Sequence, residues 1–299
     1  MGDLQMKMSR FALCLALGAA LVSLSACAQA ASPAPQATVA PQATVAPQAT
    51  VAPQTTAVPS GQPAPVQTGL IREQILEGET GTIPYSYYLP EGYDGETPLP
   101  MVVVMPGYDR MWFGEESSGS NLDWSGFLCW TELPQESIVV SAQLTDWGET
   151  SAEQTITLTE YLLDAYNIDP NRVYANGYSG GGETMSLVMG MRPDLFTAYL
   201  QCSSQWDGAY EPVVAARVPV YFVIGEGDEY YGSEPSRQAY DRLYDLYTAA
   251  GLTEEEIGRL LVLDIKDADY FRDGGAPSQH GGGNLFAGDP EIMGWLFGQ

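Results

Sequence analysis

The stretch of sequence that decides the fold is Gly177-Tyr178-Ser179-Gly180-Gly181, which has the pattern Gly-x-Ser-x-Gly. The strand-like run Arg172-Val173-Tyr174-Ala175 precedes it, and a helix-like run that begins at Gly182-Glu183-Thr184 follows it. A serine hydroxyl is a weak nucleophile, so it must stand on a tight turn where a base can take its proton and a helix N-terminus can stabilise an oxyanion. The five-residue pattern is short enough to arise by chance, and its strand–turn–helix setting is what predicts a nucleophile elbow at Ser179.

The chain contains one histidine, His280. A serine nucleophile needs an imidazole as general base, so His280 is the candidate for that role. The candidate acid is Asp228, which ends Gly225-Glu226-Gly227-Asp228 directly after the apolar run 218–224. Asp267 and Asp269, after the next apolar run, are the alternatives for the acid. A lone histidine is more often a surface or packing residue, but the order of the three residues favours a catalytic triad.

Apolar runs alternate with helical patterns from about residue 70 onward. Apolar runs, typical of buried parallel strands, cover 101–105, 138–142 and 218–224, and two more strands are expected over 196–202 and 260–265. Antiparallel edge strands are expected over 70–76 and 82–89. Helices are expected from Ser151, where Ser151 and Gln154 have the spacing of a capping box, and near 182–192 and 236–250. This alternation predicts a doubly wound, mostly parallel α/β sheet with helices on both faces and ligands at the carboxyl ends of the strands.

The first 66 residues do not have the composition of a folded domain. Residues 1–26 join a basic start to an apolar stretch and end in Leu24-Ser25-Ala26 before Cys27, which is typical of a lipoprotein signal peptide with lipidation at Cys27. An ordinary secretory signal, cut near Ala28 or Ala30, is the alternative. Residues 27–66 are rich in Pro, Ala, Thr and Gln, with repeats of Pro-Gln-Ala-Thr-Val-Ala, and predict a disordered linker. We therefore expect an extracytoplasmic, lipid-anchored protein whose catalytic domain spans 67–299.

Charge and residue counts exclude several classes of function. The formal net charge is −26, so the surface repels nucleic acid. One histidine and scattered cysteines do not make a zinc site, and the acidic residues between 264 and 273 lack the spacing of an EF-hand. We expect no metal and no cofactor. Cys129 and Cys202 lie among apolar neighbours, which favours free thiols over a disulfide.

Several motifs together resemble the esterase group of the α/β-hydrolases. They are Tyr87-Tyr88-Leu89-Pro90-Glu91-Gly92-Tyr93, Pro98-Leu99-Pro100-Met101, Ile168-Asp169-Pro170-Asn171-Arg172-Val173-Tyr174, the elbow, and Arg192-Pro193-Asp194-Leu195-Phe196. Within that group the chain is most similar to feruloyl esterases, acetylxylan esterases and polyhydroxybutyrate depolymerase-like lipoproteins, and it is also similar to prolyl-oligopeptidase-type domains. The resemblance implies the chain order Ser179, Asp228, His280 for the triad. Where the family has His-Gly this chain has Pro106-Gly107-Tyr108, and the backbone N–H groups of Tyr108 and Gly180 are expected to form the oxyanion hole.

The sequence predicts the reaction better than it predicts the substrate. Aromatic faces suit sugar rings and phenolic groups, so Trp112, Trp206 and Tyr230 are candidate substrate contacts, although any of them could instead belong to the core. The short connection from Ser203 to about Val218 predicts an open cleft without a large lid. The expected function is that of a monomeric serine carboxylesterase that acts on plant-polysaccharide or aryl esters, with a small-molecule or polysaccharide-linked substrate. The alternatives are a serine peptidase on the same triad and a non-catalytic carbohydrate-binding lipoprotein.

Overall fold

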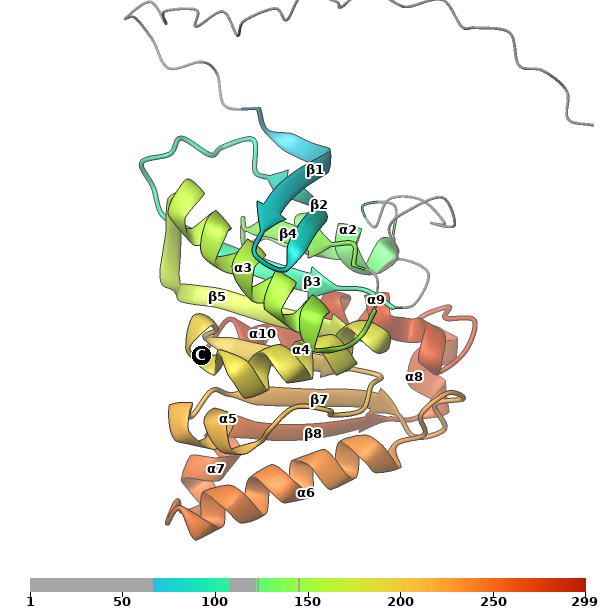
Figure 1. The fold of residues 1–299 in the computed structure, drawn as a ribbon. Coiled ribbons are helices and arrows are strands. Elements are labelled where there is room, and N and C mark those ends of the chain that lie inside the picture. The colour runs from blue at the N-terminus through green and yellow to red at the C-terminus, as the bar shows by residue number, and fades with distance from the viewer. Residues whose placement is uncertain (1–66, 108–121, 123, 145) are drawn as a thin grey trace, which may run out of the picture. The chain divides into compact units, whose positions relative to one another are not determined.

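The described residues form an eight-stranded sheet in the order β1-β2-β4-β3-β5-β6-β7-β8, as the computed structural model shows (Figure 1). The structure describes residues 67–107, 122, 124–144 and 146–299. The strands are β1 Gly69–Gly78, β2 Gly81–Leu89, β3 Leu99–Met105, β4 Ile138–Ala142, β5 Ile168–Tyr178, β6 Ala198–Cys202, β7 Val220–Gly225 and β8 Leu261–Lys266. The pairs β1–β2 and β2–β4 are antiparallel, and the other neighbours are parallel. The predicted doubly wound, mostly parallel sheet is confirmed.

Helices cover both faces of the sheet (Figure 1). They are α2 Ser125–Thr131, α3 Glu149–Ala165, α4 Gly180–Met191, α5 Glu211–Ala216, α6 Glu234–Ala249, α7 Glu254–Leu260, α8 Ala268–Asp273, α9 Gly283–Gly288 and α10 Pro290–Leu296, with short 3-10 turns at Pro193–Leu195 and His280–Gly282. Buried side chains of α3, α4, α5, α6 and α7 belong to one core, and those of α2, α8, α9 and α10 to the other. The two cores together fix the sheet between two helical layers.

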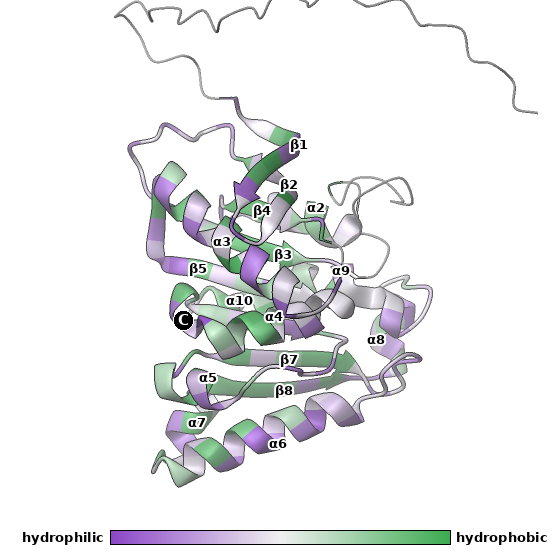
Figure 2. Cartoon of the chain, viewed as in Figure 1, coloured by the Kyte–Doolittle hydropathy of each residue, from purple (hydrophilic) through white to green (hydrophobic). Residues whose placement is uncertain are grey.

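Strand β3 shows why the sheet separates two cores. Met101, Val103 and Met105 lie in the core on one face, whereas Val102 and Val104 lie in the core on the other face. All five are nearly inaccessible to solvent, as expected for a central parallel strand that is apolar on both sides. In Figure 2 the hydrophobic colour extends along β3 and β7, whereas α6 carries alternating hydrophilic and hydrophobic patches. The helix α6 is therefore amphipathic and the central strands are not.

Two local predictions differ from the structure. β2 lies between β1 and β4, so β1 alone of the two antiparallel strands is at the edge. The capping box expected at Ser151 is also wrong, because α3 begins at Glu149 after Gly148 and the Ser151 hydroxyl donates to Asp146 Oδ1 at 2.6 Å. A capping box does form at the start of α7, where Thr253 Oγ1 accepts from the backbone N–H of Glu256.

The predicted boundaries between signal, linker and domain stay predictions. The described residues from 67 onward belong to one compact unit. The predicted signal peptide 1–26, Cys27 and the linker 27–66 lie outside the described residues. Within the part of the chain that the structure describes, every helix is too short or too polar to cross a membrane.

Candidate active site

A strained turn between β5 and α4 carries Ser179. The residue has φ 54° and ψ −128°, a conformation that is unfavourable for a side chain with a Cβ and is typical of functional sites. The flanking glycines allow the turn by close approach: a Cβ on Gly177 would lie 2.7 Å from Gly182 Cα, and one on Gly181 would lie 2.2 Å from the Met105 carbonyl oxygen. The Gly-x-Ser-x-Gly spacing therefore reflects the packing of α4 against the ends of β3 and β5.

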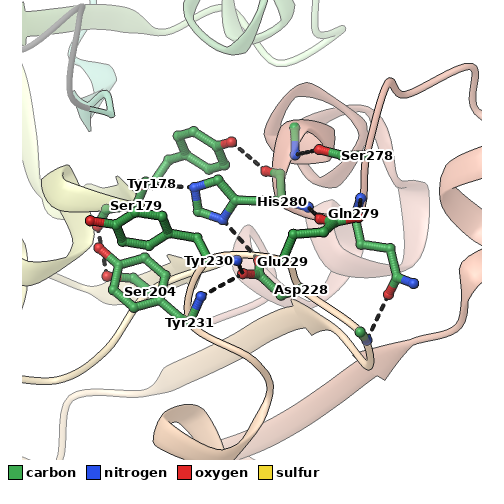
Figure 3. Close-up of polar contacts among 12 residues, drawn as sticks. Tyr178, Ser179, Ser204, Asp228, Glu229, Tyr230, Tyr231, Ser278, Gln279 and His280 are labelled. Carbon is green, nitrogen blue, oxygen red and sulfur yellow. Dashed lines mark hydrogen bonds and ion pairs between the residues drawn. The ribbon is translucent and has the colours of Figure 1, made fainter.

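Ser179, His280 and Asp228 form a continuous hydrogen-bonded chain (Figure 3). Ser179 Oγ lies 3.1 Å from His280 Nε2, and His280 Nδ1 lies 2.9 Å from Asp228 Oδ2. The serine is positioned by the end of β5, the aspartate by the turn after β7, and the histidine by the turn before α9. These three segments meet at the carboxyl edge of the sheet, where parallel α/β sheets bind ligands.

The Asp228 carboxylate is held in its charged form. It is 5% exposed, and its Oδ1 accepts the backbone N–H groups of Tyr230 at 3.0 Å and Tyr231 at 2.9 Å. Burial alone would raise the pKa of Asp228, but the hydrogen bonds from His280, Tyr231 and Tyr230 outweigh it and lower the pKa below its ordinary value. With Oδ1 occupied by two amides, Oδ2 is directed to the imidazole.

The loop that carries His280 is fastened to the loop that carries Asp228. Glu229 Oε2 accepts the backbone N–H of His280 at 2.9 Å, and Glu229 Oε1 accepts that of Gln279 at 3.1 Å (Figure 3). In return, the Gln279 side-chain oxygen accepts the backbone N–H of Gly227 at 2.8 Å. The hydrogen bond from the His280 backbone lowers the pKa of Glu229. Acid and base are thus positioned relative to one another by backbone contacts as well as by the side-chain hydrogen bond between them.

Three tyrosine rings surround the imidazole. The ring centroids of Tyr178, Tyr230 and Tyr231 lie 5.5, 5.4 and 5.7 Å from that of His280. The Tyr178 hydroxyl also donates to the backbone carbonyl of His280 (Figure 3). The imidazole is therefore enclosed by aromatic rings from the segment at the end of β5 and from the turn after β7.

A cavity of about 620 Å³ opens beside Ser179 and His280. Trp147, Tyr178, Tyr230 and Tyr231 contribute aromatic surface to its lining, and Glu183 contributes a carboxylate. Gly180 and Gly107 complete it with backbone. Gly180 is the first residue of α4, so its N–H is among the first-turn donors that have no acceptor within the helix. The volume lies within the range of about 300–1,000 Å³ that small-ligand sites occupy.

The structure places some of the predicted site residues at the cavity and others elsewhere. Gly180, a predicted oxyanion donor, and Tyr230, a predicted substrate contact, both line the cavity. Trp206 does not: it is 9% exposed and packs in the core against Tyr199 at 6.0 Å and Phe222 at 5.8 Å between ring centroids, so the prediction that it contacts substrate is not supported. The other two predicted contacts, Tyr108 in the oxyanion hole and Trp112 in the substrate site, lie outside the described residues.

Four residues with clear positions at the site were not assigned from the sequence: Trp147, Glu183, Glu229 and Tyr231. The position of Glu183 is predictable from its spacing. It follows Ser179 by four residues, and residues four apart lie on the same face of a helix. Trp147 and Tyr231 follow the ends of β4 and β7 in the chain, which is the same kind of sequence signal as the one for Tyr230. For Glu229 no sequence signal was available, since its partners are backbone groups 50 and 51 residues away.

Metal and thiol chemistry find no support among the described residues. No group of three or more histidine, cysteine, aspartate or glutamate residues within them is placed to hold a metal ion. Cys129 and Cys202 are free thiols. Burial raises the pKa of both, that of Cys129 to about 12, so neither is a reactive thiolate near neutral pH.

Comparisons with known proteins agree with this geometry. Residues 141–244, which include Ser179 and Asp228, match the prolyl oligopeptidase family. The crystal structure of a thermostable esterase superposes with a TM-score of 0.59 at 20% identity, covering 76% of this chain and 62% of that one. The chain has the α/β-hydrolase fold. It also resembles Est1E from Butyrivibrio proteoclasticus, with a TM-score of 0.53 at 13% identity, covering 76% of this chain and all of that one.

One curated relative is closer in sequence. Feruloyl esterase B of Thermothelomyces thermophilus is 31% identical to this chain over 118 residues. The matched region is 37% of this chain and 40% of the esterase, so the chain spans well under half the length of that relative. The similarity is therefore to part of an esterase, and the substrate is a separate question.

Proposed function

We propose that this protein of α/β-hydrolase fold is a serine carboxylesterase in which Ser179 forms an acyl-enzyme. The observation that supports this most directly is the hydrogen-bonded chain Ser179–His280–Asp228 at the mouth of a cavity of about 620 Å³. A nucleophile, a base within hydrogen-bonding distance of it and an acid that orients the base are what acyl transfer requires.

The proposed reaction has two halves. Ser179 Oγ attacks the ester carbonyl carbon while His280 Nε2 takes the hydroxyl proton, and backbone N–H groups of Gly180 and Tyr108 stabilise the oxyanion. The intermediate collapses, the bond between carbonyl carbon and alcohol oxygen breaks, and the imidazolium returns the proton to the leaving alcohol. Water then repeats the sequence on the acyl-enzyme and releases the acid and Ser179. Asp228 holds the imidazole and stabilises its charged form throughout.

An ester substrate is favoured over an amide by the similarity to feruloyl esterase B and to esterase structures. The aromatic lining suits aryl or polysaccharide-linked acyl groups. A serine peptidase is the second candidate, because residues 141–244 match the prolyl oligopeptidase family. Hydrolysis rates of a matched ester and amide of the same acyl group distinguish the two.

The decisive experiment is labelling with a fluorophosphonate probe. We expect wild type to be labelled and Ser179→Ala to be unlabelled. A non-catalytic carbohydrate-binding protein would be labelled in neither form, and that result would refute the enzyme.

We also propose that the protein is extracytoplasmic, monomeric and anchored to the membrane through lipid on Cys27. The support is the sequence pattern of residues 1–27 and the linker that follows. Replacement Cys27→Ala should release the protein from membranes or leave it unprocessed. Membrane retention of the processed variant would contradict the anchor.

A further inference from the structure

Glu183 places a carboxylate in the wall of the active-site cavity. It lies four residues after Ser179, in the first turn of α4, and its side chain is partly buried. The Tyr231 hydroxyl donates to Glu183 Oε1 at 2.6 Å. The carboxylate is therefore held by a residue whose ring also lies beside the imidazole of His280, at 5.7 Å between ring centroids.

This carboxylate has no cationic partner among the described residues. No lysine or arginine in them forms an ion pair with Glu183, and among the described residues that line the cavity only His280 can become positively charged. Burial raises the pKa of Glu183, the hydrogen bond from Tyr231 partly offsets this, and the charge of Asp207 raises it further. A partly buried carboxylate near a second carboxylate is costly to keep charged, and a cation entering the cavity would relieve that cost.

The rest of the lining suits a cation as well. Trp147, Tyr178, Tyr230 and Tyr231 present aromatic surface around the same space, and Tyr230 is 75% exposed. Aromatic faces arranged around an ammonium group recognise it through cation–π attraction. The net charge of −26 adds a long-range field that draws cations toward the protein and repels anions.

We propose that the substrate carries a positively charged nitrogen, which is seated between Glu183 and the aromatic lining while its ester lies at Ser179. This inference rests on the proposed esterase function and names the substrate class for the same site. Glu183 is the residue that determines this specificity. Neutral esters remain substrates, because the triad does not include Glu183, whereas esters with an anionic acyl or alcohol group are rejected.

The test compares choline acetate with its neutral isostere 3,3-dimethylbutyl acetate, in which a carbon replaces the charged nitrogen. In wild type we expect kcat/KM for the cationic ester to exceed that for the isostere by about tenfold or more, since an interaction of about 1.4 kcal/mol corresponds to a tenfold ratio. In Glu183→Gln this ratio should fall several-fold, because kcat/KM should fall for the cationic ester and stay unchanged for the neutral isostere. The matched control is Glu254→Gln, an exposed residue on α7 that removes the same charge away from the cavity and should leave the ratio unchanged.

Binding is measured separately from turnover. In Ser179→Ala we expect calorimetric titration to detect choline but not 3,3-dimethylbutanol, and we expect Ser179→Ala/Glu183→Gln to lose the choline signal. Equal rates for the two esters in wild type, or equal effects of Glu183→Gln on both, would overturn the cation site while leaving the esterase intact. Failure of the esterase would look different, because neither ester would be cleaved and Ser179 would not be labelled, while the choline titration would still decide the cation site.

Discussion

Glu229 binds the backbone of His280, not its ring: the carboxylate accepts the His280 N–H at 2.9 Å and, with its other oxygen, the N–H of Gln279 at 3.1 Å. The neighbouring Asp228 binds the ring of the same histidine at 2.9 Å. Two consecutive carboxylates therefore position the same residue. Asp228 orients the imidazole of His280, and Glu229 holds the backbone of His280.

We expect Glu229→Ala to lower kcat about tenfold with little change in KM, because a displaced imidazole weakens proton transfer and not substrate binding. A tenfold loss corresponds to about 1.4 kcal/mol of transition-state free energy. Glu229→Gln, which keeps one acceptor oxygen, should lose less. The measurements are steady-state kinetics with Glu226→Gln as the neighbouring exposed control. If Glu229→Ala matches wild type, the carboxylate is an incidental surface group.

Asp228→Asn should reduce turnover by roughly 10⁴-fold, the loss seen when the orienting acid of a serine protease triad is replaced. The fold should persist, as judged by circular dichroism. Asp267→Asn is the comparison, because Asp267 Oδ1 accepts the backbone N–H of Tyr270 at 3.0 Å as the N-cap of α8 and is expected to affect stability instead. Near-wild-type turnover in Asp228→Asn with a large loss in Asp267→Asn would reassign the triad acid.

The stability of the folded protein should depend on Asp228 in acid. Its folded-state pKa is depressed, so the carboxylate contributes stability that is present above the ordinary aspartate pKa of about 3.9 and is lost as pH falls through the lower folded-state value. Urea unfolding at pH 7 and at pH 3 should show a smaller pH-dependent loss in Asp228→Asn than in wild type. An equal loss in both proteins would mean that other carboxylates account for acid sensitivity.

Gly180→Ala should destabilise the protein although alanine is the better helix former by about 1 kcal/mol. A Cβ at this position would lie 2.8 Å from Cε3 of the Trp147 indole, and overpacking of this kind costs about 1–3 kcal/mol. Thermal unfolding of Gly180→Ala and of Gly180→Ala/Trp147→Ala measures the cost of the overlap between the new Cβ and the Trp147 indole. The double variant should regain stability relative to Gly180→Ala, and a further loss in its place would show that the indole is not the obstacle.

The sequence predicts the parts of this site that follow from strand ends, and it misses those that depend on how loops pack. Ser179 and Asp228 follow apolar runs that become β5 and β7, so their common edge could be foreseen. His280 is predictable because it is the single histidine of the sequence. The sequence does not show whether Trp206 contacts substrate or packs in the core. An aromatic residue that follows a strand has the same sequence pattern in both cases, and in the structure Trp206 lies in the core. Glu183 and Tyr231 meet across 48 residues through a side-chain hydrogen bond that no periodic pattern encodes.

The tyrosine rings around His280 have a practical consequence for spectroscopy. Ring currents from Tyr178, Tyr230 and Tyr231 act on an imidazole that has no counterpart elsewhere in the chain. Its ring protons should therefore give one isolated set of magnetic resonance signals, displaced from those of a histidine in water. Any ligand that moves a tyrosine, and any loosening of the loop fastened by Glu229, would shift that set, so the molecule carries its own probe of whether the site is assembled.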